Sequence, residues 1–359
     1  MDADEDQIQP PDGDEETRTE LFNRPSSLPD IGATMRGFST EDDAREVGNT
    51  VLCFLRILGT FFDLGRLGAL TIAYDYDDAL AQIERGFETT KVLTATRDHL
   101  AVGIAMAVPV IREGQLQSHL VINAAVANPL RNLEDPASKL ALYMLAHEAA
   151  HVHDQAVQDR AFPGLFGKRV EDYRDAILFN IGHGCWEEFI ASKLSATFAP
   201  PEQIGYFAST FCSALESAQA RGNAAIIAYR RHRDVNELVT GLTAVYKSVL
   251  VYASYLLGHL SGLEKTLPEA APMAHGLIDR TDFFRPVFQR LKTALETMHA
   301  TYGQWSGLEV FDPLKQLAEA LLNVGGMSFR KLPTGHYWVD VPYSPETMPA
   351  TNQGQESES

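Results

Sequence analysis

The stretch HEAAHVHD (147–154) places two histidines four residues apart, with a glutamate directly after the first. On an α-helix, positions i and i+4 lie one turn apart, so the imidazoles of His147 and His151 would project to the same side. That is the separation that two ligands of one tetrahedral zinc ion need. The surrounding segment favours a helix, because apolar and ligand-type residues recur at steps of three or four. These residues are Leu140, Tyr143, Met144, His147, His151 and Asp154.

An ordinary helix on which two histidines and a glutamate fall into register by chance is the alternative. The context favours a metal site, because the face that carries the motif is otherwise apolar and a charged Glu148 at its margin needs a partner. Glu148 lies about 100° round the helix from His147, where it can reach a water molecule on the metal. The sequence therefore predicts Zn²⁺ as cofactor, His147 and His151 as ligands, and Glu148 as the catalytic general base.

A catalytic zinc site usually has a third protein ligand. The segment CWEEFIAS (185–192) offers Glu188, which shares a helical face with the small residues Ala191 and Ser192 and so allows a close approach to the first helix. The alternative is that Glu187 and Glu188 are solvated acids in the first turn of a helix, a position that the macrodipole favours. If the helix is rotated by one residue from this expectation, Glu187 is the ligand in place of Glu188.

The motif HEAAH with the downstream segment EFIAS (188–192) resembles the gluzincin metallopeptidases, in which two histidines and a glutamate bind zinc. EFIAS is similar to the E-(F/Y)-x-A-D segment of HtpX-like peptidases, with Ser192 where aspartate is usual. The run LVIN (120–123), a loop and then LAHEAAH (145–151) resemble the order of strand and zinc helix in ImmA/IrrE-type peptidases. The resemblance covers about residues 68–201 and is specific only at the zinc motif. The long span from His151 to Glu188 and the large C-terminal region depart from the small ImmA/IrrE core.

Several other residues are candidates for supporting roles. Asp154 lies on the ligand face and could accept a hydrogen bond from a ligand imidazole. His183, between two glycines, could support the metal or face the substrate, although a plain loop histidine is the simpler interpretation. His153 is expected on the surface or behind the ligands.

A zinc peptidase also needs a hydrogen-bond donor for the oxyanion. Tyr252, Tyr255 and His259 share one helical face and could supply it, although such a stripe is more often part of a core. The region of Tyr337 and Tyr343 is a second possibility.

The remaining chain predicts an α+β fold that is predominantly helical. GALTIAYDY (68–76) alternates like a strand, DDALAQIERG (77–86) follows as a short helix, and two β-rich runs around REGQLQ (112–117) predict a hairpin. Asp135-Pro136 predicts a helix start, Gly182 and Gly184 are expected to interrupt the later helical region, and GHYWVDVP (335–342) is a last strand.

Four segments follow from this pattern. They are a disordered acidic tail (1–40), a zincin-like metal-binding core whose small antiparallel-containing sheet packs on the HExxH helix (41–201), a helical C-terminal part (202–345) and a second disordered tail (346–359).

Composition limits the partners and the cellular compartment that we expect for the protein. The net charge is −18, and nine carboxylates crowd the first twenty residues, so a nucleic-acid partner is not expected. Three separated cysteines argue against a disulfide framework and favour a reducing, cytoplasmic compartment. The apolar run 51–70 is interrupted by charged residues, and the run 248–263 is too short for a membrane span. Both are therefore expected to be buried helices.

These features together predict a cytoplasmic zinc metallopeptidase of the gluzincin type. A peptide or protein substrate would be hydrolysed by a zinc-bound water that Glu148 activates, with SHLVINAAV (118–126) as an edge strand that holds the peptide by strand addition. Two alternatives remain open at this point. One is a non-catalytic regulatory or binding module that keeps the fold, and the other is a zinc hydrolase that acts on a non-peptide substrate.

Overall fold

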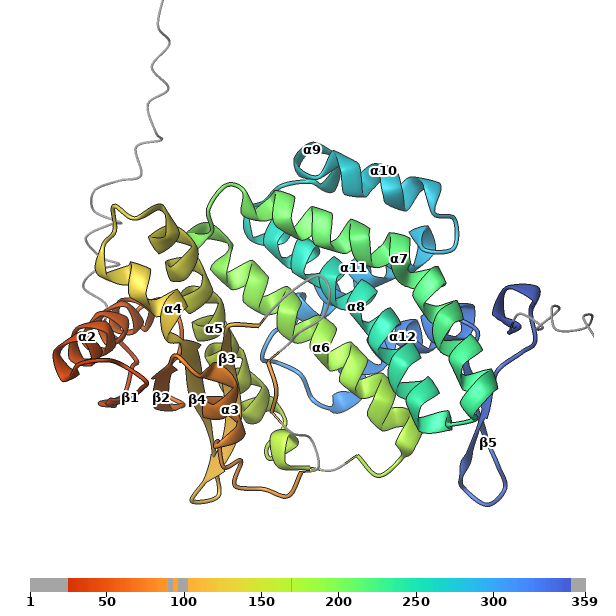
Figure 1. Cartoon of the computed structure of the whole chain (residues 1–359), viewed down its shortest axis with the longest axis horizontal. Helices are drawn as coiled ribbons and strands as arrows, with labels where there is room; N and C mark the ends of the chain where they lie inside the picture. The colour runs from red at the N-terminus through yellow and green to blue at the C-terminus, as the bar shows by residue number, and fades with distance from the viewer. Residues whose placement is uncertain (1–24, 90–92, 96–102, 169, 350–359) are drawn as a thin grey trace, which may run out of the picture.

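The computed structural model describes residues 25–89, 93–95, 103–168 and 170–349. Within them, a part built around a sheet comes first along the chain and a larger helical part follows (Figure 1). The prediction of a predominantly helical α+β fold is confirmed. The segments 1–24 and 350–359, which hold most of the two predicted tails, lie outside the described residues.

Four strands form a mixed sheet in the order β1-β2-β4-β3. β1 (Ala33–Arg36) is parallel to β2 (Leu67–Ala73), β2 is parallel to β4 (Gln115–Asn123), and β3 (Ala105–Arg112) is antiparallel to β4. The predicted hairpin is therefore present as β3 and β4. Two predictions are wrong: β4 lies inside the sheet rather than at its edge, and residues 33–36 belong to the sheet rather than to a tail.

Helices cover both faces of this sheet. Leu70, Ile72 and Leu120 pack in one cluster with α2 (Glu41–Leu58) and the motif helix α5 (Pro136–Ala161). Val108 and Val121 point to the opposite face, which α3 (Tyr76–Ala81) covers. The run 51–70 is not one buried helix, since α2 ends at Leu58 and the chain turns into β2.

The motif helix begins where the sequence predicts. The Asp135 side chain caps α5 by accepting a hydrogen bond from the backbone N–H of Ala137 at 2.9 Å, and Pro136 occupies the first turn. α6 (Tyr173–Ser195), in contrast, runs without interruption through Gly182 and Gly184. A Cβ atom on Gly182 would lie 3.0 Å from Cβ of Leu314, so this glycine allows a neighbouring helix to approach α6 closely.

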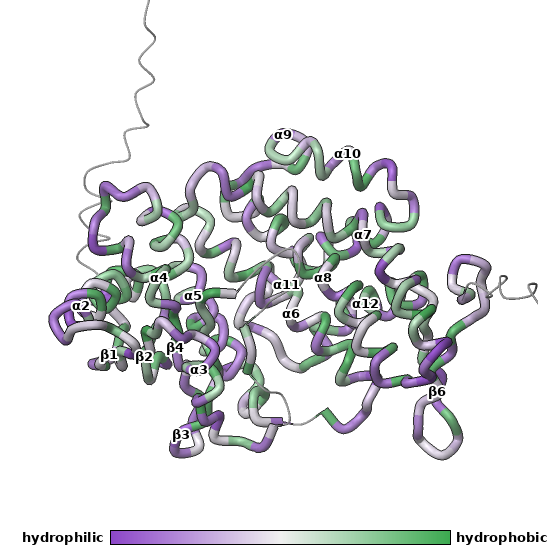
Figure 2. Tube along the Cα trace, viewed as in Figure 1, coloured by the Kyte–Doolittle hydropathy of each residue, from purple (hydrophilic) through white to green (hydrophobic). Residues whose placement is uncertain are grey.

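The helical part packs around α6 and α8, with buried aromatic residues such as Trp186, Phe211 and Phe284 in its core. Figure 2 shows hydrophobic segments along these central helices and hydrophilic ones in the β5–β6 hairpin. The prediction of a buried helix over 248–263 is confirmed. The remaining long elements are α7 (Gln203–His232), α8 (Val235–Gly262), α10 (Pro272–Arg280), α11 (Arg285–Ala300), α12 (Asp312–Val324), β5 (Ser328–Lys331) and β6 (Tyr337–Asp340). The short helices are α4 (Ala124–Ala127), α9 (Leu267–Ala270), η1 (Asn128–Arg131), η2 (Leu165–Gly167), η3 (Ala196–Phe198), η4 (Leu308–Phe311) and η5 (Pro345–Thr347).

The chain after β6 is bound to the helical part at least as far as Thr347. That residue is buried, and its backbone oxygen accepts a hydrogen bond from Nε of Arg230 at 2.9 Å. Thr347 is therefore packed against the helical part, although Glu346 is exposed, so the predicted disordered tail cannot include Thr347. None of the helices that the structure describes is both long and apolar enough to cross a membrane.

Candidate metal centre

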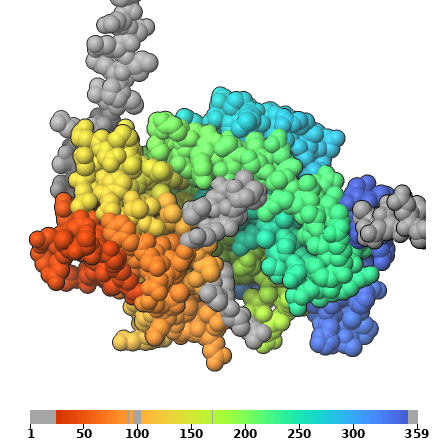
Figure 3. All heavy atoms as spheres, viewed as in Figure 1, coloured from red at the N-terminus to blue at the C-terminus, as the bar shows by residue number. Residues whose placement is uncertain are grey.

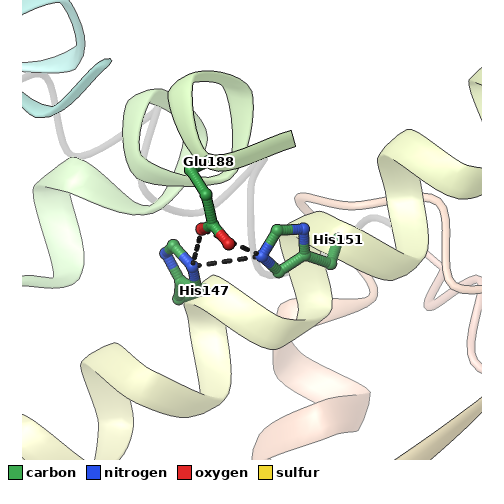
Figure 4. A group of neighbouring side chains, drawn as sticks. All are labelled: His147, His151 and Glu188. Carbon is green, nitrogen blue, oxygen red and sulfur yellow. Dashed lines mark hydrogen bonds and ion pairs between the residues drawn. The ribbon is translucent and has the colours of Figure 1, made fainter. Parts of the chain in front are cut away.

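Two helices bring three ligand-type side chains together. His147 and His151 project from α5, and Glu188 projects towards them from α6 (Figure 4). The distance between the two Nε2 atoms is 3.2 Å, and Oε2 of Glu188 lies 3.3 Å from Nε2 of His147 and 3.5 Å from Nε2 of His151. Within the described part of the chain, this is the one group of three or more such residues that could hold a metal ion.

The three separations match the shape of a tetrahedral zinc site. With zinc bonds of about 2.0–2.1 Å, the edges of a ligand tetrahedron measure about 3.4 Å. Two imidazole nitrogens and a carboxylate oxygen are also the donor set of catalytic zinc sites that keep a fourth position open. The residues present therefore fit the metal that the sequence predicts, with Glu188 and not Glu187 in the ligand position.

Electrostatics tie the three side chains together. Burial disfavours the charged form of His151, yet the adjacent Glu188 carboxylate more than offsets this and raises the pKa of His151 to about 10. Burial likewise opposes ionisation of Glu188, but the two histidines hold its pKa well below its usual value. The Glu188 carboxylate and the charged form of His151 thus stabilise each other, and a divalent cation would compete with the proton for these side chains.

Tyr255 of α8 interacts with two members of the cluster. Its ring stacks on that of His147, with centroids 5.7 Å apart and an interplanar angle of 14°. Burial and the nearby carboxylates, Glu188 first, raise the pKa of the tyrosine. Nδ1 of His147 is buried and has no hydrogen-bond partner among the described residues. Stacking on Tyr255, rather than a hydrogen bond to Nδ1, therefore orients this ring.

Glu148 points towards the edge of the sheet. Its Oε2 accepts a hydrogen bond from the backbone N–H of Ala107 on β3 at 2.8 Å, and the side chain is 9% exposed. Two turns along α5, Nε2 of Gln155 donates to the carbonyl oxygen of Ala107 at 2.8 Å. Ala107 and Gln155 are absent from the sequence predictions, since an alanine in an apolar strand and a helix glutamine carry no local signal.

The predicted role of Asp154 is wrong. This buried carboxylate accepts hydrogen bonds from Nε2 of Gln158 at 2.7 Å, Nε1 of Trp186 at 3.2 Å and the hydroxyl of Tyr302 at 3.0 Å, and from neither ligand histidine. Burial raises the pKa of Asp154 to about 6. The side chain of Asp154 points to the helical core and not to His147 or His151. Its hydrogen bonds there join α5 to α6.

His183 is a helix residue and not a loop residue. Its Nδ1 lies 3.0 Å from a carboxylate oxygen of Glu187, and its Nε2 lies 2.8 Å from Oε1 of Gln158. Burial opposes ionisation of Glu187, but its interaction with His183 outweighs this effect and lowers its pKa. Glu187 is thus engaged by His183, which explains why Glu188 is the acid that reaches the other ligands.

Two further histidines take structural positions. His153 is half-buried, and its Nδ1 accepts a hydrogen bond from the backbone N–H of Asp63 at 2.9 Å. His259 is 1% exposed and does not line the cleft at the cluster, which argues against a role at the oxyanion. Burial lowers the pKa of His259 to about 4, so it is a neutral core residue at pH 7.

The tyrosines that the sequence offers as donors to the oxyanion also differ in whether they line the cleft. Tyr252 and Tyr255 both line the cleft. The hydroxyl of Tyr337 instead donates to Asp172 at 2.8 Å, and the ring of Tyr343 stacks under Arg230. Neither of these two residues lines the cleft, so this region is excluded as a donor to substrate in the described structure.

The cluster lies in a large cleft between the sheet part and the helical part. Figure 3 shows these parts beside each other, in orange and yellow and in green. The described residues line a cleft of about 2240 Å³, with β3 on one side and α7 and α8 on the other. His147, Glu148, His151 and Glu188 all line this cleft.

Comparison with known proteins gives no match. No protein-family model, no curated protein and no solved structure is significantly similar to the chain. The chemistry of the cluster and its cleft is therefore the basis for assigning a function.

Proposed function

We propose that this chain is a zinc-dependent metallopeptidase of the gluzincin type. The observation that carries the proposal is the convergence of His147, His151 and Glu188 at separations of 3.2–3.5 Å, directly beside the Glu148 carboxylate in an open cleft. A structural zinc site would instead use four protein ligands and be closed to solvent. Three ligands in a cleft suit a metal whose fourth position faces a substrate.

The residues of the chain would divide the work as follows. His147, His151 and Glu188 would hold the zinc ion, which when bound lowers the pKa of a coordinated water and polarises a carbonyl group. Glu148 would accept the proton of the attacking water and deliver it to the leaving amine. Tyr255 would orient His147 through the stacking of the two rings.

Glu148→Gln is the substitution that tests this division. It removes the base but none of the three ligands, so zinc occupancy should remain near that of the wild type. Peptide hydrolysis should slow by about 100-fold or more. The assay is digestion of a peptide library, followed by mass spectrometry, with zinc quantified in each sample. Glu41→Gln, at an exposed position on α2, is the matched control for the loss of one carboxylate.

The outcome separates the proposal from its alternatives. Wild-type protein that holds zinc and cleaves no peptide would favour a binding module or a hydrolase of another substrate class. Cleavage that survives Glu148→Gln at full rate would exclude Glu148 as the base.

A further inference from the structure

The outer edge of β3 is already occupied at Ala107, which lines the same cleft as His147, His151 and Glu188. β3 pairs with β4 on one side, and Ala107 presents its N–H and its carbonyl oxygen on the other. Oε2 of Glu148 accepts a hydrogen bond from this N–H at 2.8 Å, and Nε2 of Gln155 donates one to this carbonyl oxygen at 2.8 Å. A substrate strand cannot use these groups without displacing a side chain of α5.

The same edge is closed further along the strand. Nε of Arg85 donates to the carbonyl oxygen of Pro109 at 2.8 Å, and the N–H of Ile111 donates to the carbonyl oxygen of Arg85 at 2.8 Å. Gly86 has φ of 74° and passes so close to Ile111 that a Cβ atom would clash with its carbonyl oxygen. The chain itself thus covers the edge from Ala107 to Ile111.

Gln155 is fixed from a second direction. Its Oε1 accepts a hydrogen bond from Oγ of Ser118 on the neighbouring strand β4 at 2.6 Å, and all three groups are buried. The chain Ser118–Gln155–Ala107 therefore holds the peptide group that follows the Ala107 Cα. In the extended strand β3, the N–H of Ala107 points to the same side as its carbonyl oxygen, away from β4 and towards Glu148.

We propose that the backbone N–H of Ala107 is a positioning group for the general base. It binds Oε2 of Glu148, which leaves Oε1 as the oxygen that serves the reaction, and it prevents the carboxylate from rotating. Hydrogen bonds to a charged acceptor are stronger than neutral ones, and a preset geometry contributes to the rate rather than to substrate affinity. This inference rests on the proposed peptidase function.

Ala107→Pro removes the donor and leaves the β3–β4 ladder intact, because the N–H of residue 107 points away from β4. Pro109 already occupies an equivalent position two residues along the strand. We expect kcat to fall about 10-fold to 100-fold, with KM and zinc affinity within about twofold of the wild type. The conservative variant Ala107→Gly keeps the N–H and should recover the rate.

A double-substitution cycle gives the second readout. In the Glu148→Gln background, Ala107→Pro should have no further effect on kcat, because the group that it positions is already lost. An unchanged kcat in Ala107→Pro would overturn the inference. Equal losses of kcat in the two backgrounds would also overturn it.

Amide hydrogen exchange tests the anchor independently of activity and of whether Ala107→Pro folds. The Ala107 amide should be protected in the wild type, and its exchange should accelerate at least about 10-fold in Glu148→Ala at unchanged global stability. Equal exchange in the two proteins would refute the anchor. Protected exchange in a wild type that cleaves no peptide would refute the proposed function alone.

Discussion

His119 on β4 is a half-buried histidine outside the candidate metal centre that makes stability depend on pH. Its Nε2 lies 2.8 Å from Oγ1 of Thr71, and burial, with smaller contributions from Arg112 and Arg36, lowers its pKa to about 4. The unfolded chain would titrate near pH 6.5. As the pH falls below this value, His119 is protonated in the unfolded state but stays neutral in the folded state. The stabilisation is therefore fully present above pH 6.5 and declines towards pH 4.

His119→Gln removes this titration. Between pH 6.5 and pH 4.5, the free energy of unfolding of the wild type should fall by about 1–2 kcal/mol more than that of the variant, a value reduced for the partial exposure of the ring. Urea denaturation at several pH values measures the difference. Parallel pH profiles for the two proteins would show that His119 titrates normally in the folded state.

At this scale, spacing predicts the ligands and little of what surrounds them. His147 and His151 follow from the four-residue step of a helix, and Glu188 follows from the need for a third ligand. The partners of Asp154 do not follow, because a shared helix face does not reveal which neighbouring helix turns towards it. Ala107 carries no signal either, because its contact with Glu148 depends on how the sheet docks on α5.

Close crossing of α6 and α8 fixes where Glu188 lies relative to α5. A Cβ atom on Gly258 would clash with the carbonyl oxygen of Phe189, so the two helices meet backbone to backbone one residue beyond Glu188. Small residues at such a crossing permit an approach that any larger side chain prevents.

Gly258→Ala should therefore destabilise the fold by about 3 kcal/mol or more and should weaken zinc binding, because α8 must move away from α6. Gly276→Ala is the control, since a Cβ atom on Gly276 of α10 would meet nothing within 4 Å, and this variant should be neutral or slightly stabilising. Thermal unfolding of the two variants compares them. Equal midpoints would contradict the close crossing.

The elements themselves are largely predictable. The hairpin, the capped start of α5 and the last strand follow from local patterns, and the structure contains each. The expectation that glycines interrupt α6 is wrong, because sequence alone does not distinguish a glycine that ends a helix from one that admits a neighbour. The parallel pairing of β1 with β2 also lacks a local signal, since it joins segments separated by a whole helix.

At the scale of the whole molecule, the cleft exists because the two parts of the chain meet along α5 and α6. α5 belongs to the core of the sheet part, and α6 belongs to the core of the helical part. The candidate metal centre takes His147 and His151 from α5 and Glu188 from α6 (Figures 1 and 4). A zinc ion bound here would therefore join the two parts, and its binding free energy would add to the stability of the fold.

Zinc content of the purified protein tests the central claim most directly. Elemental analysis after growth in zinc-replete medium should give about one zinc ion per chain for the wild type. Glu188→Ala should lose the metal because only two protein ligands remain, whereas Glu187→Ala, one position away, should keep it because Glu187 is bound to His183 instead. Wild-type protein with less than about a tenth of an equivalent, or zinc retained at full occupancy in Glu188→Ala, would contradict the metal centre described by His147, His151 and Glu188.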